Sequence, residues 1–94
     1  MMDRGESLQR CAESLRQALD PVLSAQTRAV VTVSVRSGDY GDVLCTLVRH
    51  AARDGLAVPD TVRVLVAEEL TAEGCPLSAE WVLDRLARTP RAAA

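Results

Sequence analysis

The chain has 94 residues, a formal net charge of −2 and an apolar content of 48%, so we expect a single globular domain rather than a disordered chain. Its 11 basic residues are outnumbered by 13 acidic ones, which argues against a broad phosphate-binding surface. No apolar run is long enough to span a membrane, and the charged N-terminus lacks the apolar core of a signal peptide. Three scattered cysteines form no CxxC pair. Together these features predict a cytoplasmic protein with free thiols.

The first predicted helix spans Glu6 to Leu19. Apolar residues recur in it at i, i+3, i+4 and i+7, the spacing of an amphipathic helix. These residues are Leu8, Cys11, Ala12, Leu15, Ala18 and Leu19. Pro21 ends or kinks the helix.

Two valine-rich segments are ambiguous. The first is "RAVVTVSVRSG", residues 28–38, and the second is "TVRVLV", residues 61–66. Their valines and threonines favour strands by propensity. In the first segment, however, Val30, Val31, Val33 and Val35 also fit a helix face. The residues alone leave helix and strand open for both segments.

The segment Asp39 to Asp54 predicts the central helix of the fold. At 100° per residue, one apolar stripe lies beside a second stripe of mostly small residues, so the buried arc covers more than half of the circumference. The first stripe is Tyr40, Val43, Leu44, Leu47 and Ala51, and the second is Gly41, Cys45, Val48 and Ala52. We expect this helix to contact neighbours on two sides and to expose Asp42, Thr46, Arg49 and Arg53. Gly55 supplies its left-handed C-terminal position.

The next predicted helix begins at Asp60 as its N-cap and runs to about Glu73, before Gly74. Its inner face consists of Val62, Val66 and Leu70.

The last predicted helix spans Ala79 to about Arg88 and is capped by Ser78. Leu77 packs on Val82 as a hydrophobic staple, and Val82, Leu83 and Leu86 face inward. We therefore expect one helical domain over residues 1–89 and a disordered tail over residues 90–94.

No catalytic, metal or cofactor site is predicted, and we expect no enzyme activity. A metal would need several converging His, Cys or carboxylate ligands, and Cys45 and His50 point in different directions on one helix. Cys75 has no histidine near it in sequence to act as its base. We interpret His50 as a partly buried structural residue.

Residues 44–70 also fit a helix-turn-helix DNA-binding module. The stretch "AARDGLAVPDTVRVL" contains the alanine, the turn glycine and the helix start of that motif. Its second helix would place its N-terminal residues in the major groove. It offers Arg63 there, followed by the acidic residues Glu68, Glu69 and Glu73, which would repel phosphates. Nucleic-acid binding is therefore disfavoured.

Acidic residues gather in the last third of the chain. They are Glu68, Glu69, Glu73 and Glu80. One interpretation is a solvated helix face. The other is a recognition surface for a basic protein, where charge steers association and sets partner choice.

The order and spacing of these segments resemble small helical immunity proteins, which neutralise toxins of the Maf and contact-dependent growth inhibition systems of bacteria. An acidic-aromatic-glycine triplet opens the central helix of that family and is matched here by Asp39, Tyr40 and Gly41. The family's apolar-x-Pro element is matched by residues 57–59. Its acidic-Trp element is matched within "PLSAEWVLDRL" by Glu80 and Trp81. The similarity extends over about residues 23–86, and the family often has Glu where this chain has Cys45.

The resemblance implies an all-α fold, a compact bundle of about five short helices around the central helix of residues 39–54, and it makes both ambiguous segments helical. It implies an immunity protein that binds and occludes a cognate toxin domain, commonly a nuclease. We expect the contacts to come from Asp39, Tyr40, Asp42, Glu68, Glu69, Glu73, Glu80 and Trp81. A helix-turn-helix module and a helical interaction or assembly domain are the alternatives, and homodimerisation stays open.

Overall fold

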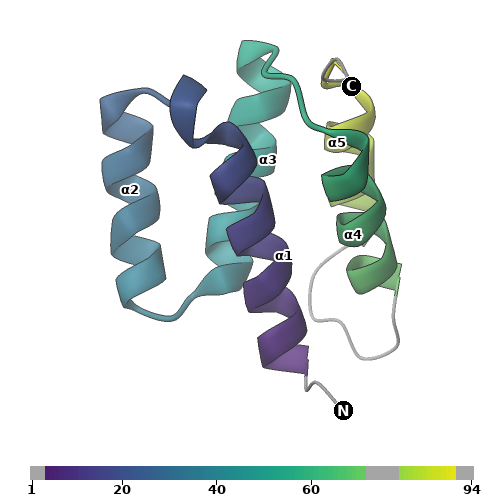
Figure 1. The fold of residues 1–94 in the computed structure, drawn as a ribbon, viewed down its shortest axis with the longest axis horizontal. Coiled ribbons are helices and arrows are strands. Elements are labelled where there is room, and N and C mark those ends of the chain that lie inside the picture. The colour runs from purple at the N-terminus through teal and green to yellow at the C-terminus, as the bar shows by residue number, and fades with distance from the viewer. Residues whose placement is uncertain (1–3, 72–78, 91–94) are drawn as a thin grey trace.

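Five α-helices and one short 3₁₀ helix make up the residues that the computed structural model describes, 4–71 and 79–90 (Figure 1). They are α1 (Arg4–Leu19), η1 (Asp20–Val22), α2 (Ala25–Arg36), α3 (Tyr40–Asp54), α4 (Asp60–Thr71) and α5 (Ala79–Ala87). These described residues contain no strand. The all-α expectation is therefore confirmed, and both ambiguous valine-rich segments are helical.

Local capping explains why α2 forms a helix despite its β-branched residues. The Ser24 side chain accepts a hydrogen bond from the Thr27 backbone N–H at 3.1 Å, which satisfies one of the free donors at the helix start. Gly38, at a positive φ of 73°, makes the turn into α3, a conformation that glycine adopts without steric cost. At the other end of α3, Gly55 takes the left-handed position with a φ of 66°, as expected.

α3 is the central helix, and it packs against α1, α2 and α5 (Figure 1). It therefore has three neighbouring helices, where the sequence predicted contacts on two sides of it. This explains an error in the predicted solvent face, because Thr46 was expected to be exposed and is buried. The predicted second stripe is only partly buried, since Gly41, Cys45 and Ala52 are intermediate in exposure while Val48 is fully buried.

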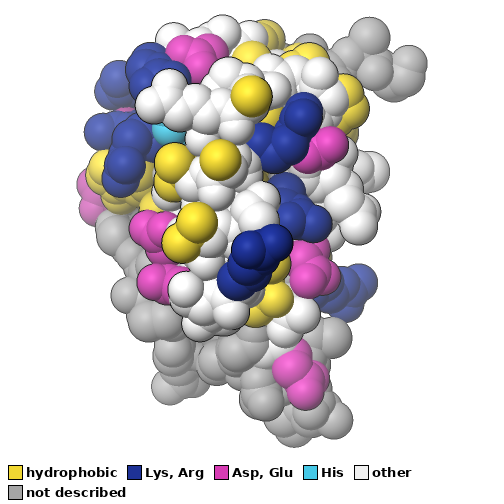
Figure 2. All heavy atoms as spheres, turned by 90° about the vertical axis from the view of Figure 1, so that its left-hand side faces the viewer, with side chains coloured by type: hydrophobic (Ala, Val, Ile, Leu, Met, Phe, Trp, Pro, Cys, Tyr) yellow, Lys and Arg dark blue, Asp and Glu magenta, His cyan; other side chains and the backbone are white. Residues whose placement is uncertain are grey.

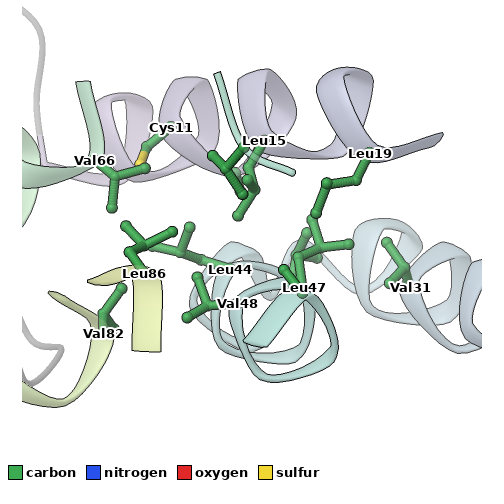
Figure 3. Close-up of a cluster of buried hydrophobic side chains, with 14 of the residues drawn as sticks. Cys11, Leu15, Leu19, Val31, Leu44, Leu47, Val48, Val66, Val82 and Leu86 are labelled. Carbon is green, nitrogen blue, oxygen red and sulfur yellow. The ribbon is translucent and has the colours of Figure 1, made fainter. Parts of the chain in front are cut away.

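Every α-helix contributes aliphatic side chains to one core (Figure 3). Leu15, Leu44, Leu47 and Val66 have no exposed surface. Burial of this apolar surface is the main stabilising force. The remaining fully or nearly buried core residues are Cys11, Ala12, Leu19, Leu23, Val31, Val43, Val48, Ala51, Val58, Leu70, Val82 and Leu86.

The start of α4 differs by one residue from the prediction. Asp60 is the first helical residue rather than the cap, because the Pro59 carbonyl accepts the N–H groups of Val62 and Arg63, both at 3.1 Å. Val66 and Leu70 are buried and Val62 packs against the core, which confirms the inner face. The expected C-terminal part at Glu73 and Gly74, and the Leu77–Ser78 start of the last helix, lie outside the described residues.

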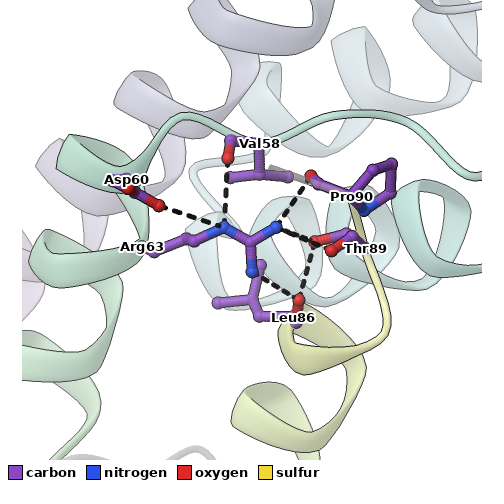
Figure 4. A network of polar contacts seen from close by, with 6 residues as sticks. All are labelled: Val58, Asp60, Arg63, Leu86, Thr89 and Pro90. Carbon is purple, nitrogen blue, oxygen red and sulfur yellow. Dashed lines mark hydrogen bonds and ion pairs between the residues drawn. The ribbon is translucent and has the colours of Figure 1, made fainter. Parts of the chain in front are cut away.

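The side chain of Arg63 joins the start of α4 to the end of α5 (Figure 4). Its guanidinium donates to the Val58 carbonyl at 3.0 Å, the Leu86 carbonyl at 2.6 Å, the Pro90 carbonyl at 2.8 Å, and both the carbonyl and the hydroxyl of Thr89 at 2.8 and 2.6 Å. We call these five residues the Arg63 cluster. Because the last carbonyls of a helix lack partners within the helix, a cation here satisfies them and complements the helix dipole.

The folded domain extends beyond the predicted boundary at residue 89. The Pro90 carbonyl accepts hydrogen bonds from Arg63 and from the Val58 backbone N–H, the latter at 3.0 Å. Pro90 therefore belongs to the fold rather than to a loose tail, and residues 91–94 lie outside the described part of the chain.

Candidate partner-binding surfaces

The acidic-aromatic start of α3 has a structural role. Asp39 is the N-cap of α3, and its carboxylate accepts the Asp42 backbone N–H at 3.1 Å. Tyr40 is partly buried and packs against the core. The Asp42 carboxylate accepts the Ser34 hydroxyl of α2 at 2.5 Å, so it links the two helices while remaining exposed. Asp39 and Asp42 are thus surface carboxylates at the α2–α3 junction, whereas Tyr40 is mainly a packing residue.

The glutamates of the last two helices lie at the same end of the α4–α5 pair. Glu68 is exposed and Glu69 is half-buried near the end of α4, and Glu80 is exposed at the start of α5. α4 and α5 pack against each other and run in opposite directions (Figure 1), which brings those two ends together. Glu73 lies outside the described residues.

Trp81 lies between two arginines. The guanidinium carbon of Arg85 is 4.7 Å from the centre of the indole ring, and that of Arg49 on α3 is 5.9 Å away, both within the range of cation–π attraction. One part of the ring packs against the core. The rest lines a shallow surface hollow together with Glu80, Asp84 and Arg85. The Asp84 carboxylate pairs with Arg85 at 3.0 Å and Arg88 at 3.2 Å.

Cys45 and His50, the two residues of α3 considered as metal ligands, have different surroundings. Burial raises the pKa of the Cys45 thiol, and Arg49 opposes that shift, so the reactive thiolate is disfavoured near neutral pH. Burial lowers the pKa of His50, and the nearby Arg53 lowers it further. The Arg53 guanidinium lies 2.7 Å from His50 Nδ1. Within the described residues, no three His, Cys, Asp or Glu side chains are grouped as metal ligands would be.

In the helix-turn-helix interpretation, Arg63 is the basic residue that would contact DNA. In the structure its guanidinium is already hydrogen-bonded within the fold. Only 16% of its side chain is exposed, and its donors are directed at the carbonyls of the Arg63 cluster. In addition, α4 packs against α1 and α5 rather than extensively against α3, whereas the two helices of that motif pack on each other. This geometry weighs against a DNA-reading helix.

A row of exposed valines on α2 was not predicted. Val31 and Val35 face the bundle, as expected for a helix, but Val30 is 51% exposed and Val33 is 65% exposed. Figure 2 shows hydrophobic side chains following one another along this face. The sequence does indicate this exposure, because α2 carries apolar residues all round its circumference. One neighbouring helix covers only one side of such a helix, so some of its apolar side chains stay exposed.

The predicted contact residues therefore fall into two groups. Asp39, Tyr40 and Asp42 lie beside α2, and Glu68, Glu69, Glu80 and Trp81 lie on α4 and α5. α2 and α5 pack on opposite sides of α3 (Figure 1). The chain consequently has two distinct surfaces with features of binding sites.

Comparisons with models of known families, with curated proteins and with solved structures found no match to this chain. No helix in the described ranges is long and apolar enough to cross a membrane.

Proposed function

We propose that this protein is an immunity protein that binds a cognate bacterial toxin domain and occludes it. The observation that carries the proposal is the surface of α5, where Trp81 lines a hollow with Glu80 and Asp84 and is flanked by Arg49 and Arg85. Tryptophan and arginine are the residue types that contribute most to protein–protein interfaces, particularly when they are already partly desolvated.

The charge of the surrounding surface favours a basic partner. Glu80 lines the hollow, and Glu68 and Glu69 lie near the end of α4 that adjoins the start of α5. The charge of Asp84 is balanced by Arg85 and Arg88. A nuclease must bind phosphates and so presents positive charge at its active site. Carboxylates at the edge of a covering surface would steer the two proteins together. In this mechanism the toxin is blocked by steric and electrostatic occlusion, without chemistry by this chain.

The test is co-expression with the toxin domain that this proposal expects a neighbouring reading frame to encode, followed by affinity measurement on the purified pair. We expect the wild-type chain to restore growth and to co-purify with the toxin. Trp81→Ala should weaken binding by about 30-fold, corresponding to an anchor of about 2 kcal/mol. Glu80→Gln should slow association at low salt more than it speeds dissociation.

Glu13→Gln on α1 is the matched control, because it removes one carboxylate from a helix surface that does not contain the hollow. It should leave binding unchanged. Failure of the wild-type chain to protect or bind would refute the proposal. So would micromolar binding to random duplex DNA with a steep salt dependence, which would instead indicate a nucleic-acid-binding module.

A further inference from the structure

The exposed face of α2 has a charge pattern that complements itself. On a helix that turns 100° per residue, Ser34 and Arg36 are about 160° apart, and the exposed residues between them are Val30, Gln26, Val33 and Ala29. Val31 and Thr27 are buried on the other side. The apolar row on α2 is therefore bounded by Ser34 along one edge and Arg36 along the other.

Each edge carries a different charge. Along the first edge, the Ser34 hydroxyl donates to the Asp42 carboxylate at 2.5 Å, and Asp39 lies three residues earlier as the helix cap. Along the second edge, Arg36 is exposed and takes part in no ion pair with any described residue. Figure 2 shows acidic side chains on one side of the hydrophobic row, and on the other side basic side chains with acidic ones beside them.

We infer that α2 is the contact surface for a second copy of this chain, related by a two-fold axis parallel to the helix. In that arrangement the valine rows meet, and Arg36 of each copy lies against Asp42 of the other. The residues are at matching heights, because Arg36 is only two positions from Ser34 and each position advances the helix by about 1.5 Å. Contacts in which the same patch is used by both copies are characteristic of two-fold dimers.

The charge pattern selects this arrangement over the antiparallel one. If the axis were perpendicular to α2, each edge of one copy would meet the same edge of the other copy. Asp42 would then face Asp42, and Arg36 would face Arg36. Like charges placed together disfavour that association. A helix of 12 residues is about 18 Å long, so the contact is smaller than a standard interface. We therefore expect a dimer that dissociates on dilution.

The inference does not depend on the toxin proposal, because α5 lies on the opposite side of α3 from α2. Its test is sedimentation equilibrium of the full chain between about 10 µM and 1 mM, a range in which weak dimers are partly associated. Wild-type protein should dimerise. Val33→Asp should be monomeric throughout, with an unchanged helical circular dichroism spectrum because Val33 is exposed.

Charge reversal tests the orientation. Arg36→Glu and Asp42→Arg should each raise the dissociation constant about tenfold, since each makes both edge contacts repulsive. An equimolar mixture of the two variants should form a heterodimer that is tighter than either homodimer, because both edges are then attractive. Asp42→Asn, which keeps an acceptor for Ser34, should weaken the dimer less than Asp42→Arg does.

A wild-type chain that remains monomeric at about 1 mM would overturn the inference. So would dimers that respond to neither charge reversal. If the wild-type chain is monomeric and Val33→Asp abolishes toxin neutralisation, this face belongs to the toxin and the dimer is refuted. If dimerisation fails while Trp81→Ala still weakens toxin binding, only the α2 inference is lost.

Discussion

At the scale of single residues, burial and the nearby Arg53 together lower the pKa of His50, the only histidine of the chain. The Arg53 guanidinium donates to His50 Nδ1 at 2.7 Å, which requires an unprotonated acceptor nitrogen. Burial is the main reason why the pKa of His50 is lowered, and the charge of Arg53 adds to it. The unfolded histidine therefore binds its proton at a higher pH than the folded one. The unprotonated His50 therefore stabilises the folded state above about pH 6.5, and this stabilisation is lost as the pH falls and the unfolded state binds the proton more readily.

Replacing Arg53 should raise the pKa of His50. We expect Arg53→Gln to move the histidine titration, followed by nuclear magnetic resonance, upward but not fully to its ordinary value, because burial remains. Arg49→Gln is the control, since Arg49 has the weakest of the effects on His50, and it should move the titration less. An unchanged or lower pKa in Arg53→Gln would show that the contact between these side chains does not form in solution.

At the scale of secondary-structure elements, the Arg63 cluster holds the last helix in place. α5 has only nine residues, and a helix of that length is not stable by itself. Its docking depends on packing by Val82 and Leu86 and on the capture of its C-terminal carbonyls by Arg63. The Thr89 hydroxyl completes the end of the helix by donating to the Leu86 carbonyl at 2.6 Å.

Removing this guanidinium should destabilise the fold more than removing an exposed one. We expect Arg63→Ala to lower the free energy of unfolding by about 2–4 kcal/mol, because several buried acceptors lose a charged donor. Arg63→Lys should restore only part of it, since an ammonium lacks the planar fork of donors. Urea denaturation measures both.

Arg28→Ala is the matched control, because Arg28 also donates to carbonyls, those of Asp20 and Leu23, but its side chain is 49% exposed. It should cost less than about 1 kcal/mol. Equal losses in Arg28→Ala and Arg63→Ala would contradict a special role for the cluster.

At the scale of the whole molecule, the core is built from aliphatic side chains without phenylalanine. The central α3 places Leu44 and Leu47 among residues of the neighbouring helices (Figure 3). Small branched side chains pack such a core densely, so the neighbouring side chains can rearrange only a little. One truncation should therefore leave a cavity that the surroundings cannot fill.

Leu44→Ala should lower the free energy of unfolding by about 2–5 kcal/mol, through lost burial and the remaining cavity. Val33→Ala, which also shortens an aliphatic side chain on a helix, should change it by less than about 0.5 kcal/mol because the side chain is exposed. Chemical denaturation of both variants gives the comparison. Similar losses for the two would mean that Val33 is buried in solution, as it would be in a stable dimer at the concentration used.

Much of the fold was predictable from residue patterns. The periodicity of residues 6–19 and 39–54, and the C-terminal glycine Gly55, identified α1 and α3 with nearly correct bounds. Periodicity was less informative for α2, because its apolar residues lie on all sides of the helix. Their pattern therefore does not predict which side of α2 packs against α3. Val30 and Val33 were therefore not recognised as exposed, and Thr46 was not recognised as buried.

The candidate sites were less predictable for a different reason. Glu80 and Trp81 were predicted as contact residues, but the stacking of Arg49 on Trp81 depends on how α5 crosses α3. Arg63 gave no local signal at all, since four of its acceptor atoms lie 23 to 27 residues further along the chain. The identity of the partner is a property of a second molecule, and no pattern within this chain determines it.

The Arg63 cluster also has a consequence for the way the protein matures during translation. The arginine leaves the ribosome before Thr89 and Pro90, so a nascent chain whose α1 to α4 are already outside carries a guanidinium that cannot yet reach its last acceptors. Domains generally form as units while synthesis proceeds from the N-terminus. Here we expect the final closure to wait for the last two residues of the cluster. A ribosome stalled before residue 89 would hold a protease-sensitive intermediate, and one stalled on an added C-terminal linker long enough to carry Pro90 out of the exit tunnel would hold a resistant domain.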